Sequence, residues 1–241
     1  MAHRTSRGLG LVEILVAIAL GLFVTASVAT LVVSQLNEQR LLLQEARLGQ
    51  DLRATVDLIA RDLKRAGHWG SAERGIWSGQ SGAPPANPYA GLHPAAGTAA
   101  TTAATSLGYR YSRDVSENQV ADSNEAFGFR INANTNAFEL RLAGNAVVPG
   151  TGDQWQALTD PALLRITRWQ VQHELRSVSL LSHCAEPTCP ASSTTCPPVW
   201  QRHVVRIDLE ARDARDASVR RSLATEVLLR NDEVSGSCPG T

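Results

Sequence analysis

One uncharged segment limits the possible folds of this 241-residue chain more than any other feature. From residue 14 to residue 33 no side chain carries a charge, and only Thr25, Ser27 and Thr30 are polar. Twenty helical residues, at about 1.5 Å each, extend for about 30 Å, which is the thickness of the hydrocarbon core of a bilayer. The segment therefore predicts a membrane-spanning helix near the N-terminus.

The charges around this segment predict its orientation. Arg4 and Arg7 precede it, and no acidic residue occurs before Glu13. Basic residues beside a membrane helix keep that side in the cytoplasm. We therefore expect a single-pass protein of the inner membrane, with a cytoplasmic N-terminus and a periplasmic head.

Four cysteines lie in the last quarter of the chain, which suits disulfides formed in an oxidising compartment: Cys184, Cys189, Cys196 and Cys238. A zinc site that includes His183 is an alternative, but the C-x4-C-x6-C spacing lacks the paired C-x2-C pattern of common zinc sites. Free thiols are a third possibility. We favour disulfides, and we expect no metal and no cofactor.

The N-terminal segment has three interpretations. An ordinary secretory signal peptide would be cleaved after Ala29, but the apolar region of such a signal normally has about 7–15 residues. A plain membrane anchor would leave Glu13 at the level of the lipid headgroups. A processed leader would end in Gly8, so that the mature chain begins at Leu9 and has glutamate as its fifth residue.

The third interpretation accounts for the most residues, because this stretch resembles the N-terminal signal of type IV pilins and pseudopilins. The signal consists of a leader glycine, an apolar first residue, a glutamate four residues later and a spanning helix. Two departures are that Leu9 stands where phenylalanine is commoner, and Gly10 where serine or threonine is usual. Cleavage after Gly10 is an alternative, but cleavage between Gly8 and Leu9 restores the spacing of the family.

The resemblance implies a purpose for the acid at the start of the apolar run. A carboxylate inside a membrane costs about 2.5–3.5 kcal/mol on insertion scales, so Glu13 should have a partner. In these families the prepilin peptidase removes the leader and methylates the new amino terminus, which here is Leu9. The glutamate meets this amine on a neighbouring subunit, so we expect Glu13 to act in assembly rather than in catalysis.

The helical pattern continues beyond the membrane span. Between residues 39 and 66, apolar residues fall on one narrow face and charged residues on the opposite face. Basic residues crowd the last turn, and Gly67 can adopt the left-handed conformation that ends a helix. We predict a helix over residues 9–66, with 11–33 in the membrane and 34–66 amphipathic. The apolar face comprises Leu41, Leu48, Leu52, Val56, Ile59, Leu63 and Ala66.

After the helix, the pattern predicts a β-rich head over residues 67–241. Residues 78–106 are rich in Pro, Gly, Ala and Thr and predict a flexible insert. Alternating apolar and polar residues then predict antiparallel strands at 138–142, 164–175, 205–211 and 223–229, with a hairpin loop at 211–218. The predicted fold class is α+β and pilin-like, with a long N-terminal helix packed on an antiparallel β-sheet head and with C-terminal disulfides.

Two further motifs, "RDLKRAGHWG" at residues 61–70 and "EVLLRND" at 226–232, resemble the PilW minor pilins of type IV pili. The resemblance implies a minor pilin that helps to initiate pilus assembly and lies in the fibre or at its tip. Its expected partners are the prepilin peptidase, other minor pilins, the major pilin, the assembly platform and a tip adhesin. It also implies that Cys238 joins the C-terminal loop to the sheet through one of the other three cysteines, which leaves the pairing open.

Two alternative functions remain at this point. The J-type minor pseudopilin of type II secretion shares the same layout. A secreted β-domain that binds a ligand, exported by an ordinary signal peptide, belongs to a different class.

The sequence carries no motif of a familiar enzyme. It has no P-loop, G-x-S-x-G elbow, H-E-x-x-H helix or dinucleotide fingerprint, and its six histidines are scattered. Arginines cluster at residues 202–221, but Asp208, Glu210, Asp213 and Asp216 alternate with them, so the local positive field largely cancels. We therefore expect neither catalysis nor nucleic-acid binding.

Overall fold

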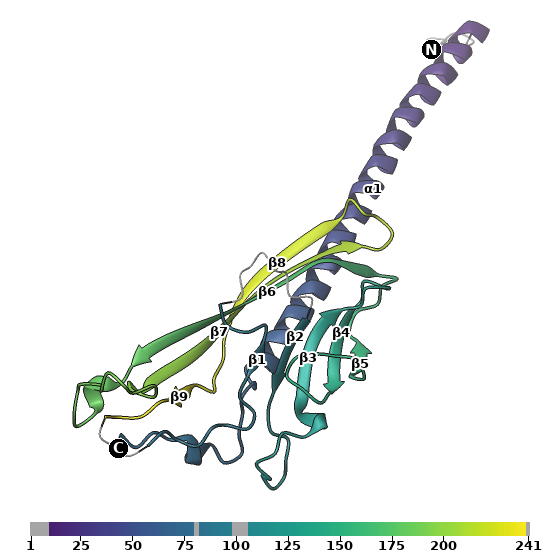
Figure 1. Cartoon of the computed structure of the whole chain (residues 1–241). Coiled ribbons are helices and arrows are strands. Elements are labelled where there is room, and N and C mark those ends of the chain that lie inside the picture. The colour runs from purple at the N-terminus through teal and green to yellow at the C-terminus, as the bar shows by residue number, and fades with distance from the viewer. Residues whose placement is uncertain (1–9, 80–81, 98–105, 240–241) are drawn as a thin grey trace, which may run out of the picture. The chain divides into compact units, whose positions relative to one another are not determined.

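A computed structural model of the chain describes residues 10–79, 82–97 and 106–239, so the predicted cleavage site at Gly8 and Leu9 lies outside the described residues. The chain divides into two units, Met1–Ala46 and Arg47–Thr241, which are considered separately below. In its described part the first unit is one continuous helix. The second unit contains the end of this helix and two antiparallel sheets (Figure 1).

Helix α1 extends from Leu11 to Leu63. Its sequence contains no proline, and the backbone carbonyl of Gly10 accepts hydrogen bonds from the amides of Glu13 and Ile14 in the first turn. After Leu63 the chain continues in turns, and Gly67 adopts the left-handed conformation, with φ of +72°. The helix therefore ends three residues before the predicted residue 66, and the amide of Gly67 donates to the carbonyl of Arg110 rather than back to the helix.

Within the second unit, one face of α1 is buried. The buried residues are spaced three or four apart, which places them on a single stripe: Leu48, Leu52, Val56, Ile59 and Leu63. They form one hydrophobic core with aromatic residues of one sheet and aliphatic residues of the other. Leu41, which the sequence places on the same stripe, belongs to the first unit and is 41% exposed.

The first sheet, sheet A, supplies most of the aromatic side chains of this core. Tyr111 and Phe127 stack with ring centroids 4.0 Å apart, and Phe129 stacks on Phe138 at 5.7 Å. The strands run in chain order across the sheet: β1 (Leu92–His93), β2 (Ser106–Arg110), β3 (Ala126–Ile131), β4 (Phe138–Ala143) and β5 (Gln154–Ala157).

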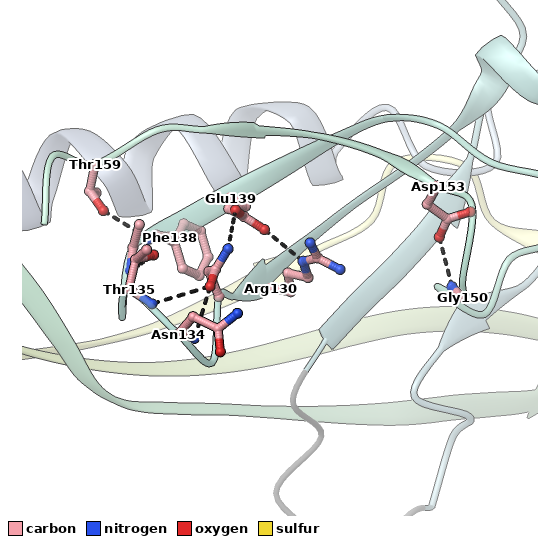
Figure 2. Close-up of polar contacts among 10 residues, drawn as sticks. Arg130, Asn134, Thr135, Phe138, Glu139, Gly150, Asp153 and Thr159 are labelled. Carbon is pink, nitrogen blue, oxygen red and sulfur yellow. Dashed lines mark hydrogen bonds and ion pairs between the residues drawn. The ribbon is translucent and has the colours of Figure 1, made fainter.

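Side-chain hydrogen bonds organise the turn between β3 and β4. The side-chain oxygen of Asn132 accepts bonds from the amides of Asn134 and Thr135, at 2.9 and 3.2 Å. Glu139 on β4 then binds both Asn132 and Arg130, each at 2.7 Å (Figure 2). The turn and the strand after it are thus joined by one polar network.

Strands β2 and β3 do not follow the alternating pattern and were not predicted. Gly108 and Gly128 face each other in the ladder. A Cβ atom at Gly108 would overlap the carbonyl of Val147, and one at Gly128 would overlap the carbonyl of Leu107. Both strands are also buried over most of their length, so polar residues do not alternate with apolar ones.

The second sheet, sheet B, contains three of the four predicted strands, and the fourth is β4 of sheet A. Its long central strand β7 exposes charged residues on one face and buries the other face: Val205, Ile207, Leu209 and Ala211. The sheet has the order β6, β7, β8, with β9 also paired to β7. The bounds are Leu164–Ser179 for β6, Val199–Asp213 for β7, Arg220–Leu228 for β8 and Glu233–Ser235 for β9.

Three short 3-10 helices complete the secondary structure of the described residues. They are η1 (Ala72–Gly75), η2 (Ser123–Glu125) and η3 (Leu181–His183). The predicted α+β class, with a long apolar N-terminal helix and antiparallel strands, is confirmed.

Both disulfides lie near the C-terminus, as predicted. Cys238 pairs with Cys184, and Cys189 pairs with Cys196, so the cysteines are not left as free thiols or as zinc ligands. The first bond spans 54 residues and ties the end of the chain to the segment after β6, whereas the second closes a local loop of 7 residues.

The two disulfides should differ in their effect on stability. In the chain-entropy model, the longer loop is stabilised by about 4 kcal/mol and the shorter by about 2.5 kcal/mol. We expect Cys184→Ser/Cys238→Ser to lower the free energy of unfolding more than Cys189→Ser/Cys196→Ser does. Chemical denaturation of the full-length protein in detergent, followed by tryptophan fluorescence, measures both. An equal loss for the two variants would contradict the prediction.

Candidate assembly site

The first unit presents an apolar surface that no other part of the unit covers. None of the apolar window of α1 is buried, and the helix is long and apolar enough to cross a membrane. Leu11, Phe23 and Leu31 are each more than 60% exposed. A continuous apolar surface of this kind requires lipid or another protein around it.

The few polar side chains on this helix satisfy their hydrogen bonds within it. The hydroxyls of Thr25 and Ser27 donate to backbone carbonyls four residues earlier, and that of Thr30 to the carbonyl three residues earlier, each at 2.8 Å. None of the three therefore needs water or an external partner. The hydroxyls are compatible with burial in a membrane or in a bundle of helices.

Glu13 differs from these hydroxyls because its charge has no partner among the residues that the structure describes. It lies exposed in the first turn of α1, where a negative charge is favourable for the helix dipole. No ion pair reaches it within the part of the chain that the structure describes. No other acid follows until Glu38. Glu13 is thus an isolated carboxylate at one end of an apolar helix.

In the second unit, the two motifs at residues 61–70 and 226–232 meet. The side-chain amide of Asn231 donates to the carbonyls of Ala66 and Arg65, at 2.8 and 3.4 Å. The side chain of Asn87 donates to the carbonyl of Gly67 at 2.7 Å. The carbonyl of Arg65 also accepts the backbone amide of His68, and the two asparagines supply side-chain donors to the carbonyls of Ala66 and Gly67 after the end of the helix.

Asp62 of the first motif joins the end of the helix to sheet A. Its carboxylate accepts hydrogen bonds from the hydroxyls of Tyr109 and Tyr111, at 2.5 and 3.2 Å. Burial, reinforced by the negative charge of Asp62, holds the pKa of Tyr109 well above its usual value, so this hydroxyl remains a donor. Arg65 forms an ion pair with Asp62 and lies over the ring of Tyr111, 4.1 Å from its centroid.

A cavity of about 250 Å³ lies where the motifs meet, lined by Gly67, Trp69, His203 and Asn231 among others. His203 is hydrogen bonded to His173 at 2.8 Å, and the other ring nitrogen of His173 contacts the carbonyl of Pro94 at 3.0 Å. Because a carbonyl only accepts, Nδ1 of His173 carries a proton. Burial lowers the pKa of both rings, which favours the neutral pair.

One group of acids has the spacing of metal ligands. Carboxylate oxygens of Asp114, Asp122 and Glu125 lie within 4.8 Å of one another. Both oxygens of Glu125 accept backbone amides, from Arg113 at 2.7 Å and from Asp122 at 2.9 Å. Asp122 and Glu125 form a capping box at η2, so hydrogen bonding of the loop accounts for their positions.

The structure therefore places the predicted site residues in different situations. Gly8 and Leu9 lie outside the described residues, Glu13 lies in the first turn of α1, and all four cysteines are paired. Sequence reasoning missed the roles of Asp62 and Asn231. Their presence in the two motifs was a signal, but the motifs are more than 150 residues apart and their contact is tertiary.

Comparison with known protein families places most of the chain in one of them. A family model described as prepilin peptidase-dependent protein B matches residues 41–229, which is more than half of the chain. The matched range includes the motif at 61–70 and most of the motif at 226–232. No curated protein sequence and no solved structure matches the chain significantly.

The Asp62 contact should contribute measurably to stability. Asp62→Ala leaves the fully buried hydroxyl of Tyr109 without its acceptor, and we expect a loss of about 2–3 kcal/mol in the free energy of unfolding. Asp57→Ala, a change of an exposed acid on the same helix, should alter it by less than about 0.5 kcal/mol. Chemical denaturation followed by tryptophan fluorescence measures both variants, and equal values would disprove the assigned contact.

Proposed function

The chain belongs to the family of prepilin peptidase-dependent protein B, and from this premise we propose that it is a minor pilin of the type IV pilus, of the PilW type. The observation that carries the proposal is the isolated Glu13 in the first turn of an exposed apolar helix. The family match begins at residue 41, so the N-terminal signal is an observation independent of it.

In this proposal, the protein is first inserted into the inner membrane. Its N-terminus is cytoplasmic and its head periplasmic, in accord with Arg4 and Arg7 before the span. The prepilin peptidase cleaves between Gly8 and Leu9 and methylates the amino group of Leu9. The apolar helix then leaves the lipid and packs among the helices of other subunits.

Glu13 has an assembly role in this scheme. The carboxylate neutralises the amino terminus of a neighbouring subunit when both groups are surrounded by apolar side chains. An unpaired charge is costly in such surroundings, so a subunit that is out of register is disfavoured by several kcal/mol. The pair therefore selects one axial register, and the hydrophobic surface of the helix supplies most of the attraction.

The head carries the more specific part of the proposal. We assign the protein to a complex of minor pilins that initiates the fibre and remains at or near its tip, at the cell surface. The major pilin, the assembly platform and a tip adhesin are the further partners. The contacts of Asp62 and Asn231 support a pilin-like subunit, because they hold the C-terminal end of α1 against the sheets within the second unit.

The mature N-terminus provides the most direct test. Mass spectrometry of the protein isolated from its membrane should find a chain that begins at methylated Leu9. Deletion of the peptidase should restore the residues before it. A chain that begins at Thr30 would show an ordinary signal peptide and would contradict the proposal.

Substitution of the acid tests its role separately from processing. Glu13→Ala should be cleaved normally but should enter sheared fibres at least tenfold less efficiently, because a neighbouring amine is left unpaired in apolar surroundings; tenfold corresponds to about 1.4 kcal/mol. Glu38→Ala, which removes an exposed acid beyond the apolar segment of the same helix, is the matched control. Normal incorporation of Glu13→Ala would remove the assembly role.

Pilus and pseudopilus differ in phenotype. Deletion of the gene should abolish surface fibres and twitching motility while leaving the export of folded enzymes unchanged. The opposite pattern would assign the protein to a type II secretion pseudopilus.

A further inference from the structure

The outer face of sheet B carries charged residues in rows that cross its strands. Residues that are paired in register on neighbouring antiparallel strands project to the same face, about 5 Å apart. On the three strands β6, β7 and β8, successive rows therefore alternate between the core and the outer face. Among the residues that the structure describes, the arginines at one end of the outer face form ion pairs with acids, and those at the other end do not.

At one end of this face, opposite charges are paired. Arg206 on β7 contacts Glu226 on β8 at 2.9 Å and Glu174 on β6 at 3.8 Å. Arg176 contacts the same two glutamates, and Arg202 forms an ion pair with Asp232 at 3.7 Å. Each arginine at this end has at least one acidic partner.

At the other end, three arginines are aligned directly across the three strands. Arg165 on β6 pairs in register with Arg212 on β7, and Arg212 pairs with Arg220 on β8. None of the three forms an ion pair within the ranges that the structure describes, and Nε of Arg212 is buried without an acceptor. Nε of Arg220 donates only to a backbone carbonyl, that of Ala217, at 3.1 Å.

Two acids of the loop beside this arginine row accept hydrogen bonds within the loop itself. Asp213 accepts the backbone amides of the β7–β8 loop, and Asp216 accepts the amide and hydroxyl of Ser218. Glu210 lies in the adjoining row, where its register partner is Arg168. The row therefore remains a positive strip, in contrast to the paired end of the same face.

Like charges placed directly opposite one another destabilise a sheet. The strip is tolerated because its side chains are partly solvated, but a partner that supplies negative charge would stabilise it. We propose that Arg165, Arg212 and Arg220 form a docking strip for a carboxylate-bearing surface of a neighbouring pilin subunit. This proposal rests on the minor-pilin function and adds to it the surface and the chemistry of one contact.

The dimensions and surroundings of the strip favour carboxylates of a protein over an extended polyanion. Three arginines on adjacent strands cover about 10 Å, which matches a small group of acids on a folded surface. Beyond the strip, Asp208 and Glu210 occupy the next rows of β7 and would repel a phosphate chain that continued along the face. Arginine also forms paired hydrogen bonds with carboxylates, which orients the partner.

Photo-crosslinking in the native membrane tests this contact with the full-length protein. A photoreactive amino acid replaces Ser222, an exposed residue of β8 whose register partner is Glu210 in the adjoining row. Ultraviolet light should yield an adduct with another pilin subunit, identified by mass spectrometry, through a peptide that contains Asp or Glu. The triple variant Arg165→Gln/Arg212→Gln/Arg220→Gln should reduce this adduct at least fivefold, and so should an increase in salt.

The paired end of the same face supplies the matched control. Arg176→Gln/Arg202→Gln/Arg206→Gln removes the same amount of charge from the same sheet and should leave the adduct unchanged. It should lower the melting temperature, because it breaks ion pairs, whereas the triple variant of the strip should maintain or raise it. An adduct that survives in the strip variant would overturn the proposal.

Charge reversal identifies the chemistry. Arg212→Glu should abolish the adduct, and replacement of the crosslinked acid of the partner by arginine should restore it. If the arginine substitution in the partner does not restore the adduct, the proposal that a carboxylate of the partner binds the strip is wrong. Binding of the purified protein to a 30-base-pair DNA duplex in 0.15 M salt, lost in the strip variant, would instead assign the strip to nucleic acid.

The same cells distinguish failure of this proposal from failure of the minor-pilin function. If Glu13→Ala is excluded from fibres while the strip variant crosslinks normally, the pilin function stands and the docking strip is wrong. If Glu13→Ala enters fibres normally and the adduct contains a protein that is not a pilin, the assigned function and the assigned partner are both wrong.

Discussion

The burial of the apolar stripe of α1 by two sheets is the interaction on which the head depends. Leu48 to Leu63 contribute one face of a helix, and neither sheet alone surrounds that face. Sheet A contributes aromatic rings and sheet B contributes aliphatic residues of its inner face. Polar contacts then hold the end of the helix in place. Asp62 in its last turn accepts from tyrosine hydroxyls, and Asn87 and Asn231 donate to carbonyls of the turns that follow. Apolar burial supplies the attraction, and hydrogen bonds supply the position.

In the proposed assembly, too, apolar surfaces would supply the attraction and charged groups would determine the position. The apolar part of the helix in the first unit would associate with any apolar surroundings, lipid or protein. An isolated carboxylate at its start adds a requirement for one particular partner, because a charge in such surroundings needs an opposite charge. On the head, a strip of unpaired arginines would add a second requirement that is independent of the first. The choice of partner subunit would therefore depend on a few charged residues. These residues lie on surfaces that are otherwise apolar or whose other charges are paired.

Much of the fold follows from periodicity. The stripe on α1 and the strands β6 and β7 were predictable, because one face of each is buried and the other is largely solvated. Strands β4 and β8 also follow the alternating pattern, but Glu139 and Arg141 of β4 are buried, and most of β8 is exposed. Strands β2 and β3 were not predictable, because they are buried over most of their length and contain glycines that a close backbone contact requires. In the candidate site, the place of Glu13 in the first turn of an apolar helix could be predicted, because one acid stands out in an apolar pattern, whereas its assembly role stays a proposal. The contacts of Asp62 with two tyrosines could not be predicted. In the sequence, a charged residue near the end of a helix looks the same whether it is buried or exposed to solvent.

The sequence by itself determined the local features of this protein: an apolar helix with one acid at its start, half-buried strands, and cysteines suited to disulfides. Each of these depends on residues that are near one another in the chain, so spacing reveals it. The tertiary structure alone decided the pairing of Cys184 with Cys238, the capping of the helix end by Asn231, and the alignment of Arg165, Arg212 and Arg220. These features join distant residues, and strand register determines the last of them. A shift of one residue along β7 would put Arg212 on the opposite face of the sheet and abolish the strip.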